Sequence, residues 1–142
     1  MTETSPASFM TFTDDPIEKR LATVGKILPH TKAKIIDRNG RIVPVGSRGE
    51  ILVAGFALQK GYWKNPAKTE EVMRTDEEGI LWMHTGDEGM FDEEGYLSIT
   101  GRIKDVIIRG EQAQHPSRIL TKPPKKHKLN QIRRREYISS RD

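Results

Sequence analysis

Three side chains that could do chemistry, Asp87, Arg102 and Lys104, lie close together in the chain, between short apolar runs and beside glycine turns. Asp87 ends a Thr-Gly-Asp tripeptide, where glycine allows close backbone approach and the carboxylate can accept the two hydroxyl hydrogens of a ribose diol. Arg102 follows a glycine and can donate several hydrogen bonds to a sugar or a phosphate. Taken singly, each has an ordinary structural explanation, because Gly-Asp turns and solvated strand-end charges are common.

The elements that must position these side chains are mainly β-strands. Turn signals recur every eight to fifteen residues between runs rich in Ile and Val, which is typical of an antiparallel β domain. We expect strands near 22–28, 33–38, 41–44, 50–54, 80–84, 96–100 and 105–109. The dipeptide Asn39-Gly40 predicts a two-residue type I′ hairpin, since both central positions of that turn need positive φ.

Two further local signals fix the organisation of the body. Asn65 followed by Pro66 predicts the start of a short helix, with Asn as the cap and Pro in the first turn. The tetrapeptide Asp-Glu-Glu-Gly occurs at 76–79 and again at 92–95, each time before an apolar run. We interpret this as duplicated turn chemistry rather than a duplicated domain. Neither run has the alternating oxygen ligands of a calcium loop.

Length and composition exclude several classes of protein. The chain has 142 residues and no cysteine, which indicates one domain without disulfides, thiolate metal ligands or a thiol nucleophile. The four histidines are scattered without metal-ligand spacing, and no catalytic residue is assigned. With no long apolar run and no secretory signal, we expect a cytoplasmic chain without a membrane span.

Positive charge is concentrated at the C-terminal end. Residues 121–142 carry 8 of the 24 Lys and Arg and 2 of the 20 Asp and Glu, a local charge of +6 within a total of +4. The region after Gly110 combines Pro, Gln and clustered charge, and we expect it to be disordered. A basic tail could also bind nucleic acid through phosphates, but it lacks the interleaved aromatic residues that stack on bases, so this alternative is disfavoured.

The order and spacing of these segments resemble a known family. The segments "MTETSP", "GKILPHTKAKIID", "GEILVAG", "GYWKNPAKTEE" and "HTGDEGMFDEEGYLSITGRIKDVIIRGE" together are similar to the adenylate-forming superfamily, the AMP-dependent synthetases and ligases. Similarity is greatest to the medium-chain fatty-acid CoA ligases and covers about residues 1–111. The resemblance implies a mainly β fold with one or two short helices, the antiparallel β-barrel-like third subdomain of the large domain. It divides the chain into residues 1–101 of that subdomain, the hinge and first strand of a C-terminal domain at 102–111, and a tail at 112–142.

The resemblance also implies roles for individual residues. Thr2 matches a hydroxyl that contacts the AMP phosphate, and Glu3 a carboxylate that helps to hold Mg²⁺. Asp87 and Arg102 match the pair that binds the ribose. Lys104 falls on the hinge, where backbone rotation exchanges the adenylating and thioester-forming arrangements. Such enzymes use ATP, Mg²⁺ and CoA to convert a fatty acid into its acyl-CoA through an acyl-adenylate.

The departures from the family pattern limit these expectations. The phosphate loop that precedes the Thr-Glu motif has no counterpart here. Gly110 falls in the CoA region, but the chain lacks one glycine and the Asn-Ile of the family's Gly-Gly-Glu-Asn-Ile. No Lys is assigned to the C-terminal lysine that aids adenylation. We therefore expect these residues by themselves to be inactive and to associate with themselves or with the missing subdomains. A non-catalytic AMP-binding or regulatory module stays open, as does a mitochondrial location for a parent enzyme.

Overall fold

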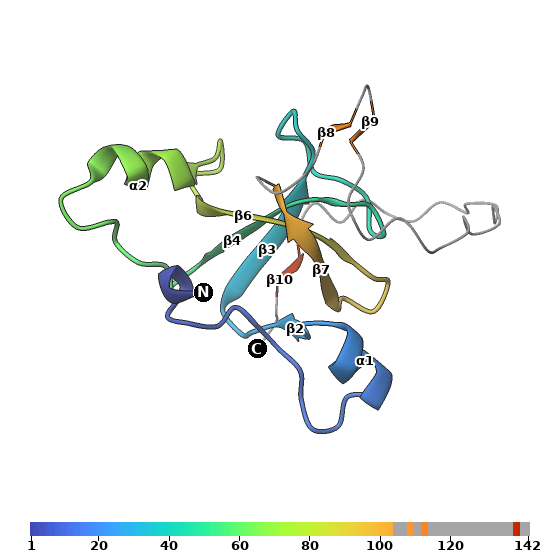
Figure 1. Ribbon diagram of the computed structural model, residues 1–142. Coiled ribbons are helices and arrows are strands. Elements are labelled where there is room, and N and C mark those ends of the chain that lie inside the picture. The colour runs from blue at the N-terminus through green and yellow to red at the C-terminus, as the bar shows by residue number, and fades with distance from the viewer. Residues whose placement is uncertain (104–107, 110–111, 114–137, 140–142) are drawn as a thin grey trace.

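The structure is a computed structural model, and it describes residues 1–103, 108–109, 112–113 and 138–139. Its largest element is a six-stranded sheet in which β10, β3, β4, β6 and β5 follow one another and β7 also pairs with β6 (Figure 1). The strands of this sheet are β3 (Thr31–Ile36), β4 (Gly49–Gly55), β5 (Met73–Thr75), β6 (Leu81–Phe91), β7 (Leu97–Arg102) and β10 (Ile138–Ser139). All of its pairings are antiparallel.

Smaller elements surround this sheet. Two further antiparallel pairs join β1 (Phe9–Met10) to β2 (Lys26–Ile27) and β8 (Ile108–Arg109) to β9 (Gln112–Ala113). The helices α1 (Ile17–Ala22) and α2 (Pro66–Val72) lie on opposite sides of the sheet in Figure 1, and a short 3₁₀ turn, η1 (Thr2–Thr4), is near the N-terminus. The predicted mainly β fold with short helices is confirmed, although the sheets are open rather than closed into a barrel.

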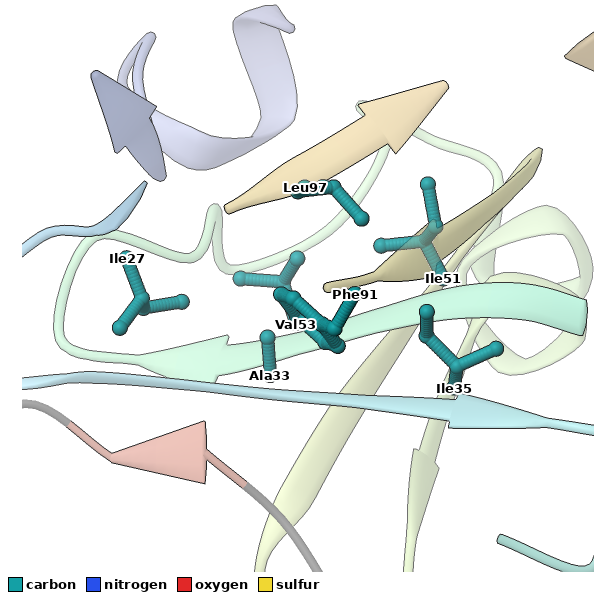
Figure 2. Packing of buried hydrophobic residues seen from close by; sticks show 7 residues of the cluster. All are labelled: Ile27, Ala33, Ile35, Ile51, Val53, Phe91 and Leu97. Carbon is teal, nitrogen blue, oxygen red and sulfur yellow. The ribbon is translucent and has the colours of Figure 1, made fainter. Parts of the chain in front are cut away.

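The core lies on both faces of the central strands. Four consecutive residues of β4, from Ile51 to Ala54, are buried, so their side chains cover both faces of the sheet. Figure 2 shows the larger cluster, in which side chains from five strands meet on one face: Ile27, Ala33, Ile35, Ile51, Val53, Phe91 and Leu97. The second cluster, on the other face, consists of Ile36, Leu52, Ala54 and Trp82. Apolar burial on both faces fixes the positions of β4 and β6, and therefore of the polar residues that these strands carry.

Helix α2 forms where the sequence predicts it. The side chain of Asn65 accepts a hydrogen bond of 3.0 Å from the Lys68 N–H, and Pro66 occupies the first turn. Helix α1 is not among the predicted elements, and the strand predicted at 22–28 is reduced to β2. The α1 residues Ile17 and Leu21 are 64% and 83% exposed, so α1 has no buried apolar face that would give a helical period.

The hairpin at residues 37–41 corrects a prediction. The two-residue type I′ turn at Asn39-Gly40 is wrong, since only Gly40 of this pair has positive φ, at 79°. Instead Asp37 and Arg41 close a longer turn through an N–H···O bond of 2.8 Å. The Asp37 carboxylate accepts the N–H groups of Asn39 and Arg41 at 2.8 and 2.9 Å, which favours this geometry over the tighter one. The strand expected at 41–44 is reduced to a single bridge between Ile42 and Ile36.

The predicted disordered tail at 112–142 falls largely outside the described residues, as does most of the strand expected at 105–109. The described parts, 108–109, 112–113 and 138–139, are the short strands β8, β9 and β10. The division into 1–101, 102–111 and 112–142 stays a prediction. Within the described residues, no helix is long and apolar enough to cross a membrane.

Candidate nucleotide-binding site

The candidate site is built on an irregularity in the pairing of β4 with β6. Glu50 lies opposite Glu88, and Leu52 lies opposite His84, so three residues of β6, 85–87, face the single residue Ile51. The middle residue of the three, Gly86, has a φ of 71°, which is left-handed and suits glycine. We call residues 85–87 the β6 bulge. It turns the chain out of the regular ladder, and its last residue is the functional candidate Asp87.

Thr85 fastens one side of the β6 bulge to β4. Its hydroxyl donates a hydrogen bond of 2.8 Å to the carbonyl oxygen of Ile51. The same hydroxyl oxygen accepts the N–H of Asp87 at 3.1 Å. The side chain of Thr85 therefore replaces ladder bonds that the bulge interrupts, and it fixes the backbone from which the Asp87 carboxylate projects.

Glu50 fastens the other side. Its Oε1 atom accepts the N–H of Gly86 at 3.3 Å, and its Oε2 atom is 3.0 Å from Nδ1 of His84. Burial alone would raise the pKa of Glu50, but the hydrogen bond with His84, its charge and the Gly86 N–H outweigh burial and hold the pKa below the usual 4.5. The Arg74 charge acts in the same direction. Glu50 is thus an ionised carboxylate at neutral pH.

Asp87 and Arg102, to which the resemblance assigns the ribose, lie together in the structure. They lie directly opposite each other on β6 and β7, and Nε of Arg102 is 2.8 Å from Oδ1 of Asp87. The Asp87 side chain is 20% exposed and that of Arg102 is 64% exposed, so the pair sits at the surface with the carboxylate partly shielded. A carboxylate held in this way can accept hydroxyl hydrogens, while a guanidinium beside it can donate to oxygen.

Thr2 and Glu3 lie elsewhere, in η1. The Glu3 carboxylate accepts a hydrogen bond of 3.0 Å from the Tyr62 hydroxyl, and its backbone carbonyl accepts the Gln59 N–H at 2.9 Å. Burial and this bond to the carboxylate raise the pKa of Tyr62 above its usual 10. Among the described residues, no hydrogen bond or ion pair joins η1 to β6 or β7. The structure thus fixes η1 against the 59–62 loop rather than against the Asp87–Arg102 pair.

The remaining predicted site residues, Lys104 and Gly110, lie outside the described residues. Within the described part of the chain, no group of three or more His, Asp and Glu side chains could hold a metal ion. A hollow of about 390 Å³ lies on another part of the surface. Its lining includes none of the predicted site residues and consists of His30, Lys32, Ala54, Gly55, Leu58, Gln59, Lys60, Ile80 and Leu81.

Sequence reasoning missed two residues of the site, Glu50 and His84. Both lie in segments that resemble the family, and the resemblance implies no role for either. A signal was available for His84, which directly precedes the Thr-Gly-Asp turn. Glu50 gives no local signal, because it contacts His84 and Gly86 across 34 and 36 residues of chain.

Comparison with known proteins places this geometry in context. The family model for AMP-binding enzymes matches residues 1–63. The chain is 59% identical over 119 residues to an acyl-CoA ligase, sidI, of Aspergillus fumigatus, covering 84% of this chain and 20% of that protein. It is 40% identical over 119 residues to the mitochondrial medium-chain acyl-CoA ligase ACSF2 of Bos taurus, covering 83% of this chain and 19% of that protein.

A solved structure agrees with these relatives. The ATP-bound MatB protein of Rhodopseudomonas palustris superposes with a TM-score of 0.71 at 36% identity, covering 82% of this chain and 22% of that chain. The chain therefore spans about a fifth of the length of the curated relatives that it matches.

Proposed function

Because the chain belongs to the family of AMP-binding enzymes, we propose that its β6–β7 edge binds the ribose of the nucleotide used by an acyl-CoA ligase. The observation that carries this proposal is the Asp87–Arg102 pair, with its 2.8 Å contact at the end of the β6 bulge. One carboxylate can accept both hydroxyl hydrogens of a ribose diol, and the adjacent guanidinium can donate to the sugar oxygens. Neither interaction reads the base, so this edge would bind the sugar of ATP and of AMP alike.

The reaction that such a site serves is the activation of a carboxylic acid by ATP and its transfer to CoA. The mitochondrial relative is a medium-chain acyl-CoA ligase, and on that similarity we assign a fatty acid as the acid substrate. In this proposal Thr2 contacts the AMP phosphate, Lys104 acts as the hinge, and Gly110 lies in the region that approaches CoA. Binding the ribose would fix the nucleotide so that its phosphate is held at a defined position relative to the incoming acid.

Mg²⁺ would enter through the nucleotide. Magnesium is commonly held by one or two carboxylates together with substrate phosphates and water, rather than by a cage of protein ligands. Glu3 offers a single carboxylate, of which one oxygen accepts the Tyr62 hydroxyl. This donor set fits an ion shared with ATP phosphates, where Mg²⁺ would neutralise phosphate charge. In this proposal Tyr62 orients the Glu3 carboxylate through its hydrogen bond.

The ribose proposal can be tested by titrating the protein with AMP and with 2′,3′-dideoxy-AMP, following backbone amide signals by NMR. We expect AMP to shift the signals of Gly86, Asp87 and Arg102, and the dideoxy analogue to bind about tenfold more weakly because it lacks the diol. Asp87→Ala should abolish this preference. The matched control Asp14→Ala, at an exposed aspartate, should retain it. Equal affinity of the wild-type protein for both nucleotides would contradict ribose binding by Asp87.

A second candidate is a non-catalytic module that binds AMP or docks on a complete ligase. The bulge and the ion pair favour it as much as they favour the ligase, because both functions need the same ribose contact. Catalysis separates the two. We propose that these 142 residues bind nucleotide without activating an acid. The described residues offer contacts to the ribose, but they include no set of groups that would hold the triphosphate. Turnover in a pyrophosphate–ATP exchange assay with octanoate would contradict this proposal.

A further inference from the structure

The Glu50 carboxylate joins two strands at the point where their ladder is interrupted. One oxygen is 3.0 Å from the His84 ring, directly before the β6 bulge, and the other accepts the Gly86 N–H at 3.3 Å, within it. The side chains of Glu50 and His84 are only 22% and 20% exposed. Hydrogen bonds to a partly buried ionised carboxylate are stronger than those between neutral groups.

The contact with Gly86 is the part that matters for Asp87. In a regular antiparallel ladder the N–H of Gly86 would be satisfied by a carbonyl of the neighbouring strand, but the bulge removes that partner. Glu50 supplies an acceptor in its place. Gly86 has a φ of 71°, and space around it is open, since a Cβ built there would meet no atom within 4 Å. The bonds that connect this part of the backbone to side chains are those of Glu50 to the Gly86 N–H and of Thr85 to the Asp87 N–H.

The charged groups around Glu50 come from two strands. His84 and Glu88 lie on β6, where Glu88 is the direct partner of Glu50, and Arg74 on β5 adds a favourable charge. The Glu88 carboxylate is engaged by the Thr100 hydroxyl at 2.7 Å on the β7 side. Glu50 is thus the carboxylate bonded to the bulge, whereas the Glu88 carboxylate is bonded to Thr100 of β7.

From this geometry we propose that Glu50 is a positioning residue for the nucleotide. By bridging the His84 ring and the Gly86 N–H, its carboxylate holds the β6 bulge in the conformation that aims Asp87 at the ribose hydroxyls. Thr85 holds the opposite side of the same three residues through the carbonyl of Ile51. The inference rests on the proposed function, because it takes ribose as the ligand of Asp87. Glu50 itself would not touch the nucleotide.

The test compares Glu50→Ala with Glu50→Gln in the full chain. Gln keeps an oxygen that accepts the Gly86 N–H and an amide that can donate to His84, so it is the rescuing variant. Glu70→Ala, at an exposed glutamate of α2, is the matched control. Two readouts are measured for each variant: amide hydrogen exchange at Gly86, with amides of β3 as the reference, and affinity for AMP and for 2′,3′-dideoxy-AMP.

We expect Glu50→Ala to speed exchange at Gly86 by about tenfold while β3 amides are unchanged, since one local hydrogen bond is lost. The same variant should lose about tenfold in affinity for AMP and little for the dideoxy analogue, which cannot use Asp87. Glu50→Gln should stay within about twofold of wild type in both readouts. Glu70→Ala should match wild type.

Several outcomes would decide against the proposal. Unchanged exchange at Gly86 in Glu50→Ala would show that the carboxylate does not hold the bulge. Equal losses for both nucleotides, or faster exchange throughout β3, would show a general structural role instead of positioning. If the wild-type protein does not distinguish the two nucleotides, ribose binding by Asp87 is wrong. In that case the exchange rate at Gly86 still decides whether Glu50 holds the bulge.

Discussion

Two kinds of turn in this chain differ in which residues stabilise their backbone. At Asp37, Asp76 and Asp92, an aspartate begins a five-residue turn with glycine in its fourth position, and its Oδ1 atom accepts the N–H groups two and four residues later. The bonds between carboxylate and backbone in each of these turns lie within five residues of chain. The β6 bulge is held instead by Thr85 and Glu50, through bonds that span 34 and 36 residues. The first kind of turn is local chemistry, whereas the second depends on the assembled sheet.

The two kinds of turn also differ in whether a carboxylate is left to contact a ligand. A turn closed by its own aspartate uses one carboxylate oxygen, Oδ1, for the backbone. The second oxygen is bonded to Lys34 and the Trp82 indole at Asp76, and to Lys19 at Asp92. In the β6 bulge, Thr85 and Glu50 satisfy the backbone, and the Asp87 carboxylate is left to meet Arg102. Because residues distant in the chain stabilise the backbone of the β6 bulge, the Asp87 side chain can contact a ligand.

The largest expected difference is between a glycine of the sheet beside the β6 bulge, Gly49, and a glycine of a local turn, Gly79. A Cβ on Gly49, at the start of β4, would lie 2.2 Å from the carbonyl oxygen of Ile36. Because backbone cannot move aside cheaply, we expect Gly49→Ala to lower the free energy of unfolding by about 3 kcal/mol. Gly79, in the 76–80 turn, meets no atom within 4 Å, so Gly79→Ala should cost only the left-handed φ, about 1 kcal/mol.

Urea unfolding of both variants measures this difference. A cost for Gly79→Ala equal to that for Gly49→Ala would mean that the sheet is no more demanding than a local turn. Gly49 also lies opposite Gly89 in the ladder beside the bulge, so its variant should disturb the bulge as well as the fold.

A smaller effect is expected from Thr85, which tests the bulge alone. Thr85→Val keeps the shape of the side chain but removes the hydroxyl that donates to Ile51 and accepts from Asp87. Because two partly buried hydrogen bonds are lost, the free energy of unfolding should fall by about 2 kcal/mol. Thr85→Ser retains the hydroxyl and is the control. If Val and Ser behave alike in urea, the hydroxyl does not fasten the bulge.

This division also explains what could be predicted from the sequence. The Asn65 cap and the two Asp-Glu-Glu-Gly turns were predictable because each depends on neighbours in the chain. The strands β3, β4, β6 and β7 lie where short apolar runs between turn signals predict strands. The hairpin at 37–41 was assigned to the wrong turn type because the carboxylate of Asp37, two residues before Asn39, was not counted among the turn-forming groups. Local signals thus succeed when every participant is considered.

Other features could not be predicted for physical reasons. Helix α1 is attached to the rest of the protein by charge rather than by an apolar face, since Lys19 contacts Asp92 at 2.6 Å and Glu94 at 2.8 Å. The sequence of such a helix lacks the regular spacing of apolar residues that would predict it. Asp87 and Arg102 were identified from the family resemblance, but the part played by Glu50 follows only from the register of β4 against β6. Pairing register is set by the whole sheet and not by the segment itself.

The smallest expected effect concerns the charge of a turn aspartate and depends on pH. Burial alone would raise the pKa of Asp76, but bonds from the Ile80 N–H, the Trp82 indole and Lys34 outweigh burial and lower the pKa to about 2. Because the folded pKa lies below the usual 3.8 of an aspartate, the ionised carboxylate stabilises the fold at pH values above 3.8. This contribution is lost as pH falls from about 4 toward 2.

Asp76→Asn keeps the Oδ1 oxygen that accepts the backbone N–H groups. It removes the charge and replaces Oδ2, which accepts the Trp82 indole N–H and Lys34, by an amide nitrogen that cannot accept. Urea unfolding at pH 7 and at pH 3 should therefore show a larger difference between wild type and Asp76→Asn at pH 7. Asp37→Asn is the control, because Asp37 forms a turn of the same kind but is held by the backbone and by Arg41. Lys34 contacts Asp76 at 3.1 Å and lies 4.0 Å from the Trp82 ring, which adds a distant partner to a local turn. A pH-independent difference for Asp76→Asn would mean that this distant partner contributes nothing, and that the turn is as local as its sequence suggests.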